Sequence, residues 1–293
     1  MFSLLMRPPM TTRKIKRVSI SMPTMEGAGV HLHRAFGNND VPLFDPFLLF
    51  DDFRSDTPDH YKKGFPWHPH RGIETITYML KGHAEHGDSL GNEGKIGSGD
   101  VQWMSAGSGI IHQEMPKGDI KGKMEGFQLW ANLRSADKMM HPRYRDISAE
   151  AIPSVTLDGG ATVKVICGQV GNVRGPVEDV MIEPEYLDVK LPPNTVFVHP
   201  TPEDHTVFAY VHAGSGRFDE ISNDELGNQS LVLFEPGEQV MITAGDEELR
   251  FLLVGGKPLG EPVAWRGPIV MNTQEELQQA FAEYRNDTFI KHD

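Results

Sequence analysis

Short runs of β-branched and aromatic residues recur along this chain, and turns rich in glycine and proline separate them. The chain contains 30 Gly and 21 Pro among 293 residues, so most segments between turns are too short for a long helix. Many short strands with frequent turns are typical of sandwiches and barrels, not of alternating strands and helices. The clearest runs cover residues 75–80, 162–166, 195–198, 206–211, 230–234 and 249–254.

One segment near the C-terminus has the signature of a helix. Thr273 and Glu276 have the spacing of a capping box, in which the two side chains satisfy each other's free backbone amides. Apolar residues then follow at the spacing i, i+3, i+4 and i+7, and they are Leu277, Ala280, Phe281 and Tyr284. The pattern predicts a C-terminal helix that packs one apolar face on the sheets.

A weak internal repeat relates the two halves of the chain. Segments 74–82 and 206–214 have Tyr and Gly at matching positions, and segments 99–107 and 237–245 both begin with Gly and end with Ala-Gly. The repeat predicts two similar β-domains in tandem, joined near residue 150. We expect a disordered tail over 1–10, an N-terminal domain over 11–150, a C-terminal domain over 151–270, and a helix with a tail over 271–293.

The charge balance argues against several classes of partner. There are 41 Asp and Glu against 28 Lys and Arg, a formal net charge of −13, which repels phosphate backbones and anionic lipids. We find no apolar run near the roughly 18 residues of a membrane span. Cys167 is the only cysteine, so the chain has no intramolecular disulfide, as is typical of a reducing cytoplasm. We therefore expect a cytoplasmic protein without direct nucleic-acid or membrane binding, and we expect it to be a monomer.

Two pairs of potential metal ligands stand out. His68 and His70 are two residues apart, and so are His112 and Glu114. Residues two apart on a strand point to the same face, so each pair can converge on one point. Two such strands facing each other inside a barrel would place three imidazoles and one carboxylate around a transition metal, with up to two positions open on an octahedral ion. Glu74 competes with Glu114 as the fourth ligand, because it too is polar in an apolar strand.

The order HxHxxxE…G followed by GD…G…H resembles the cupin superfamily, small β-barrels whose ligands line the interior. Two departures matter: Ser105 stands where cupins usually have proline, and His112 falls two residues later than is general. With them the chain is most similar to one branch, the pirins. The resemblance covers the chain beyond the first ten residues, and its motifs lie at 27–30, 45–49, 68–74, 88–91, 102–107, 109–114, 129–133 and 138–140.

The resemblance implies an all-β fold of two tandem cupin (jelly-roll) barrels. In pirins the two histidines of the first motif and the His and Glu of the second bind iron. On this chain the same positions are His68, His70, His112 and Glu114, which favours Glu114 over Glu74. The implied metal is one Fe(II) ion, although such a set also accepts Mn, Co, Ni, Cu or Zn.

The resemblance also implies that the C-terminal cupin holds no metal. When the halves are aligned on their shared tyrosines, Pro200 and Pro202 take the positions of the first histidine pair. When they are aligned on their shared Ala-Gly pairs, Arg250 and Leu252 take the positions of the second ligand pair. No ligand survives in these alignments, so we expect a degenerate second barrel.

The activity that the resemblance implies is that of a metal-dependent dioxygenase related to quercetinases. A flavonol such as quercetin would bind the metal through its 3-hydroxyl, and O₂ would open the ring with loss of CO. Glu114 would be both a ligand and the catalytic base. Candidate wall residues near the ligand strands are Phe65, Trp67, Trp103, Met104 and Phe127.

Pirins are also known as regulators, which gives an alternative function. In that case the chain is an iron-dependent regulatory protein that binds a transcription factor or a metabolic enzyme. The expected partners are therefore a small aromatic, flavonol-like substrate with O₂, or else another protein.

Overall fold

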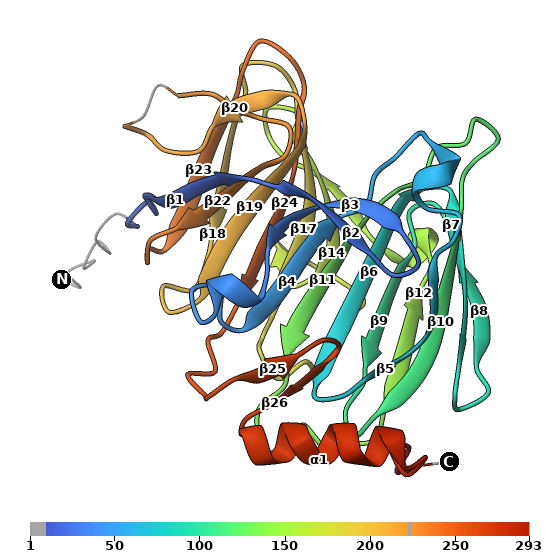
Figure 1. Ribbon diagram of the computed structural model, residues 1–293. Helices are drawn as coiled ribbons and strands as arrows, with labels where there is room; N and C mark the ends of the chain where they lie inside the picture. Colours follow the sequence, from blue (N-terminus) through green and yellow to red (C-terminus); the bar gives the residue numbers. More distant parts are fainter. Residues whose placement is uncertain (1–9, 222–223, 293) are drawn as a thin grey trace.

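The computed structural model describes residues 10–221 and 224–292 and shows two β-barrels, each built from a seven-stranded and a four-stranded sheet (Figure 1). This confirms the predicted all-β fold with two tandem barrels and one C-terminal α-helix. Each of the six predicted runs falls on a strand, and only Thr195 lies outside its strand. The tail expected over residues 1–10 lies, apart from Met10, outside the described residues.

The N-terminal barrel contains the strands between residues 22 and 147. Its seven-stranded sheet has the order β12 (Arg143–Ile147), β9 (Val101–Ser105), β6 (Ile73–Lys81), β11 (Glu125–Asn132), β4 (Phe47–Asp52), β3 (Val30–Phe36) and β2 (Met22–Glu26). Its four-stranded sheet has the order β5 (Phe65–His70), β10 (Ile110–Lys117), β7 (His83–Asp88) and β8 (Glu93–Ile96). Three 3₁₀ turns lie between strands: η1 (Asn38–Asp40), η2 (Pro58–His60) and η3 (Ala149–Ala151).

The C-terminal barrel repeats this arrangement. Its seven-stranded sheet has the order β1 (Ile15–Ile20), β22 (Ser230–Phe234), β19 (Thr206–Ala213), β24 (Leu249–Gly256), β17 (Glu185–Leu191), β14 (Thr162–Cys167) and β13 (Ser154–Thr156). Its four-stranded sheet has the order β18 (Val196–Pro200), β23 (Gln239–Ala244), β20 (Ser215–Arg217) and β21 (Leu226–Gly227). A small hairpin joins β15 (Gln169–Val170) to β16 (Val173–Arg174).

Both ends of the chain cross from one barrel to the other. Strand β1 pairs with β22 and so completes the sheet of the C-terminal barrel, although it comes first in the sequence. After the second barrel, β25 (Ala264–Arg266), β26 (Ile269–Met271) and α1 (Gln274–Arg285) return to one end of the N-terminal barrel (Figure 1). The division near residue 150 stays a prediction, and these two segments do not follow it in space.

The strand order corrects one alignment of the repeat. β23 pairs with β18 as β10 pairs with β5, so β23 is the counterpart of the strand that contains His112 and Glu114. Arg250 and Leu252 lie instead on β24, whose place in its sheet is that of β11. The alignment on the Ala-Gly pairs was therefore wrong by one strand, because the first pair follows β9 whereas the second lies at the end of β23.

The two seven-stranded sheets pack face to face and form an apolar core between the barrels. Phe50, Trp103 and Phe127 of the first sheet meet Phe208 and Leu252 of the second in this core. Each barrel also has an apolar cluster of its own. The site described below therefore lies in a barrel whose seven-stranded sheet packs against the second barrel.

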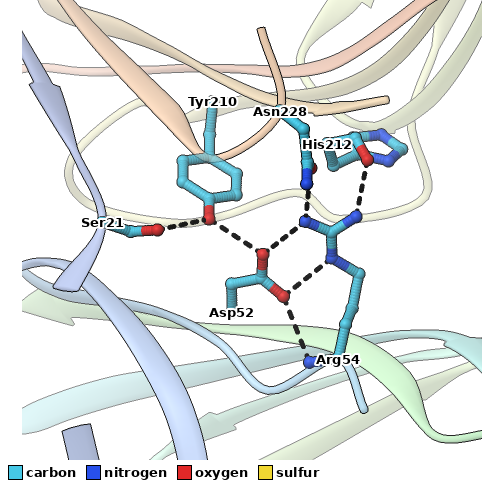
Figure 2. Close-up of polar contacts among 6 residues, drawn as sticks. All are labelled: Ser21, Asp52, Arg54, Tyr210, His212 and Asn228. Carbon is cyan, nitrogen blue, oxygen red and sulfur yellow. Dashed lines mark hydrogen bonds and ion pairs between the residues drawn. The ribbon is translucent and has the colours of Figure 1, made fainter. Parts of the chain in front are cut away.

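Two tyrosines cross this interface in opposite directions. Tyr210 of the second barrel donates to Asp52 of the first over 2.8 Å, and Tyr78 of the first donates to Asp188 of the second over 2.8 Å. Figure 2 shows how Arg54 pairs with Asp52 and also reaches a backbone carbonyl and an asparagine of the second barrel. Buried carboxylates need such partners. Tyr78 and Tyr210 thus form equivalent bonds in the two halves, which supports the internal repeat that the sequence indicated.

The helix α1 begins as the capping box predicts. The hydroxyl of Thr273 accepts from the amide of Glu276, and the Glu276 carboxylate accepts from the amide of Thr273. Leu277 and Ala280 are buried against β25 and β26. No helix in the described residues is long and apolar enough to cross a membrane.

Candidate metal centre

Three histidines meet at one end of the N-terminal barrel. His68 and His70 lie on β5, and β10 pairs with β5 so that His112 stands directly opposite His68. The Nε2 atom of His68 lies 3.0 Å from that of His70 and 3.0 Å from that of His112. Among the described residues this is the group of His, Cys, Asp or Glu whose donor atoms converge within 4.8 Å.

Backbone carbonyls fix which ring nitrogen has the proton in two of these histidines. Nδ1 of His68 lies 2.9 Å from the carbonyl oxygen of Pro66, and Nδ1 of His70 lies 3.2 Å from that of Pro268. A carbonyl can only accept, so each Nδ1 donates, and each neutral ring then has its lone pair on Nε2. Both lone pairs point into the cluster, where they repel each other unless a cation lies between them.

The fourth candidate, Glu114, lies next to the cluster. One of its carboxylate oxygens is 3.9 Å from Nε2 of His112, and the side chain is buried. Glu74 is also buried, but it accepts a short hydrogen bond from the hydroxyl of Ser105 and does not line the cavity described below. Glu114 therefore lies beside His112, although it is outside the group of three converging histidines.

Burial lowers the pKa of His68 and lowers the pKa of His70 and His112 strongly. For the last two, neighbouring imidazoles lower the pKa further. The rings are therefore neutral near pH 7, as metal ligands must be. Burial raises the pKa of Glu114 to about 7, against an opposing hydrogen bond from Thr77.

This donor set fits a divalent transition metal. Two nitrogens bound to one ion at roughly 2.0–2.1 Å and at a right angle are about 3 Å apart, which is the separation seen here. The charge of the site also fits a metal ion, because a cation would hold the buried carboxylate of Glu114 ionised. The Nδ1 of His112 has no hydrogen-bond partner among the described residues, unlike the Nδ1 atoms of the other two histidines.

A cavity of about 530 Å³ opens onto the cluster, a volume in the range of small-molecule sites. His68, His70 and Glu114 contribute to its lining. Most of its apolar wall is made by Leu32, Leu49, Phe53, Phe65, Trp130, Trp265 and Pro268. The rings of Trp130 and His70 are perpendicular, with centroids 5.2 Å apart, and the ring centroids of Trp265 and Trp130 are 6.0 Å apart.

Of the five wall residues expected from the sequence, only Phe65 lines the cavity. Trp67 is 52% exposed and does not line the cavity. Trp103 and Phe127 pack in the core between the barrels, and Met104 packs in a separate buried cluster. The error arises because neighbours along a strand alternate between its two faces. Trp265 was missed because it follows the second barrel in the sequence and reaches the site only through the fold.

The two barrels and the histidine cluster together define a bicupin, a protein of two tandem cupin domains. The family model described as Pirin matches residues 29–131, and that of the Pirin C-terminal cupin domain matches residues 186–290. The chain belongs to the pirin family. This confirms the resemblance on which the sequence interpretation depends.

Individual relatives agree with this assignment. A pirin-like protein of Caulobacter vibrioides is 43% identical over 96% of this chain and 100% of its own length. A Pseudomonas aeruginosa protein with the name "Putative quercetin 2,3-dioxygenase" is 42% identical over 94% of this chain and 97% of its own length. The crystal structure of a quercetin 2,3-dioxygenase from Acinetobacter baumannii is 30% identical, covers 95% of this chain and 98% of its own, and superposes with a TM-score of 0.87.

Proposed function

We propose that His68, His70, His112 and Glu114 bind one divalent transition metal, and that this metal is Fe(II). The support is the convergence of three neutral imidazoles on one point, with a buried carboxylate beside them. The donor set alone does not select iron, since imidazole nitrogens bind copper and nickel more tightly. Iron is the member of the series that the pirin resemblance implies.

We further propose that the protein is a dioxygenase that cleaves flavonol-like aromatic compounds. The observation that carries this proposal is the aromatic wall of the cavity, which leads directly to the histidines. A planar, hydroxylated ring system can pack against Trp130 and Trp265 while one hydroxyl reaches the donor cluster. The names of the relatives in Pseudomonas and Acinetobacter support the same class of substrate.

The metal, Glu114 and the aromatic wall have separate roles in the proposed reaction. The metal, when bound, would supply Lewis acidity towards the substrate hydroxyl and a redox partner for O₂. Glu114 would accept the proton of that hydroxyl, since a bound cation would keep this buried carboxylate ionised and able to act as a base. The aromatic wall orients the ring and excludes water. One O₂ is consumed for each CO released.

Part of the lining is polar and can form hydrogen bonds with further hydroxyl groups. Arg34 makes two hydrogen bonds of 2.8 Å to Asp51 and one of 2.9 Å to Glu26, and all three residues line the cavity. The paired guanidinium and carboxylates are held in place before a ligand arrives. They fit a substrate with several phenolic hydroxyls better than a purely apolar one.

The test is CO release from quercetin under O₂, measured for protein loaded anaerobically with Fe(II) and for the metal-free form. We expect one CO for each quercetin consumed, only in the loaded form. Metal bound at the site without any CO release would contradict the dioxygenase proposal. That result would favour the alternative function, a regulatory protein that binds a transcription factor or metabolic enzyme.

A further inference from the structure

The segment after the second barrel packs against the strand that contains two of the histidines. Ile269 of β26 forms a bridge with Arg71, the residue next to His70, and the amide of Val270 donates to the Arg71 carbonyl over 3.1 Å. Figure 1 shows α1 lying beyond β25 and β26 at this end of the N-terminal barrel. Residues 264–290 therefore belong to the first barrel in space.

This segment makes the hydrogen bond that selects the tautomer of His70. The carbonyl of Pro268, in the turn between β25 and β26, accepts from Nδ1 of His70. His68 differs, because its Nδ1 donates to Pro66 two residues earlier on the same strand. One histidine is thus oriented by its own strand and the other by a turn from the far end of the chain.

An ion pair connects this arrangement to α1. The guanidinium of Arg71 is 2% exposed and donates to Glu283 of α1 over 2.8 Å, to the carbonyl of Phe289 over 2.7 Å and to the carbonyl of Ser108 over 2.6 Å. It also lies over the ring of Phe289 at 4.2 Å. A buried guanidinium that loses its carboxylate partner is costly, so the pair holds α1 against the ligand strand.

The backbone that follows His70 packs tightly against β26. Lys138 is buried and donates to the carbonyls of Gly72 and Val270, over 2.8 and 3.1 Å. Gly72 has a φ of +77°, and a Cβ built on it would lie 1.9 Å from the carbonyl oxygen of Val270. The backbone after His70 and strand β26 are therefore held together too closely for a side chain at this position.

We propose that residues 264–290 form a positioning element for the metal site, in which the Arg71–Glu283 pair holds the β25–β26 turn so that Pro268 keeps His70 in its metal-binding tautomer. Glu283 is then a positioning residue that touches neither metal nor substrate. The same element supplies Trp265 to the cavity wall. The proposal rests on the proposed function, in which His70 is a ligand.

The test compares Glu283→Ala with Glu275→Ala, a matched change at an exposed position of the same helix. Loss of partners that orient a metal ligand typically costs about 10- to 100-fold in metal affinity. We expect Glu283→Ala to raise the Kd for Fe(II), measured by chelator competition, about tenfold, and Glu275→Ala to leave it unchanged. If Glu283→Ala fails to fold by circular dichroism, Glu283→Gln is measured in its place.

A second measurement separates positioning from general stability. In the metal-free protein, ¹⁵N NMR reports which ring nitrogen of each histidine has the proton. We expect Glu283→Ala to shift His70 towards the Nε2–H tautomer while His68 keeps its proton on Nδ1. An unchanged Kd together with an unchanged His70 tautomer would overturn the proposal. If the wild-type protein binds no metal, the proposed function fails, whereas the tautomer of His70 still tests the positioning.

Discussion

His112 is the imidazole that β10 contributes to the proposed site, and its loss would leave only two imidazole nitrogens there. We expect His112→Ala to lose most of its bound metal, because the change removes one of the three proposed imidazole ligands of the ion. Metal content after dialysis, measured by mass spectrometry, checks this. His205→Ala is the control, since His205 lies outside the histidine cluster. Equal metal content in both variants would refute the role of His112.

The carboxyl of Glu114 gives a prediction for stability against pH. In the metal-free folded protein burial raises its pKa to about 7, whereas the unfolded value is 4.5. Between these values the folded state binds more protons than the unfolded state, so the contribution of Glu114 to the free energy of unfolding falls as the pH rises.

Glu114→Gln removes this dependence. We expect the free energy of unfolding of the variant, relative to wild type, to rise by up to roughly 3 kcal/mol across that window. Urea unfolding of both metal-free proteins at a series of pH values measures the difference. A difference that does not change with pH would show that Glu114 ionises normally in the fold.

At the scale of residues, the sequence predicted the histidine cluster because strand periodicity places alternate residues on one face. It did not separate Glu114 from Glu74 without the family resemblance, since both are buried polar residues on strands. Which of the two carboxylates lies beside the histidines depends on how their strands pair with the strands next to them. That is a property of pairing between strands, which single residues do not reveal.

At the scale of elements, the β25–β26 hairpin decides the shape of the cavity. We expect Trp265→Ala to weaken flavonol binding about tenfold, because an aromatic contact in a pocket is worth about 1.5 kcal/mol. Anaerobic calorimetry with metal-loaded protein measures this affinity, and metal content should not change. Trp67→Ala is the control, since Trp67 is exposed and outside the cavity. Equal loss in both variants would contradict the assigned wall.

Elements with a local signal were predictable. The capping box places the start of α1 at Thr273, and the apolar runs correspond to strands. The exchange of β1 into the second barrel was not predictable, because an edge strand of this composition fits either sheet. The return of residues 264–290 to the first barrel likewise depends on long-range contacts such as Arg71–Glu283.

At the scale of the whole molecule, the interface between the barrels makes the two domains one unit. The paired bonds Tyr78–Asp188 and Tyr210–Asp52 relate the halves in the manner of a two-fold symmetric dimer. Tyr210→Phe leaves Asp52 without one of its donors. We expect this change to lower the free energy of unfolding by about 1–3 kcal/mol.

Tyr186→Phe is the matched control for the interface. The Tyr186 hydroxyl is also buried, but it has no hydrogen-bond partner within the described ranges, so its removal should cost little. Urea unfolding followed by fluorescence compares the two variants. The same loss for both would mean that packing, and not the tyrosine–aspartate bonds, stabilises the interface. The sequence indicated the repeat through these tyrosines, but only the paired sheets show that they cross the interface.

We propose that four side chains of the N-terminal barrel bind one metal ion where the aromatic cavity meets the histidine cluster. Anomalous diffraction from crystals of the Fe(II)-loaded protein locates this ion. We expect one peak at roughly 2.0–2.2 Å from Nε2 of His68, His70 and His112 and from a carboxylate oxygen of Glu114. A peak bound by other residues, or no peak in protein shown to contain iron, would refute this metal site.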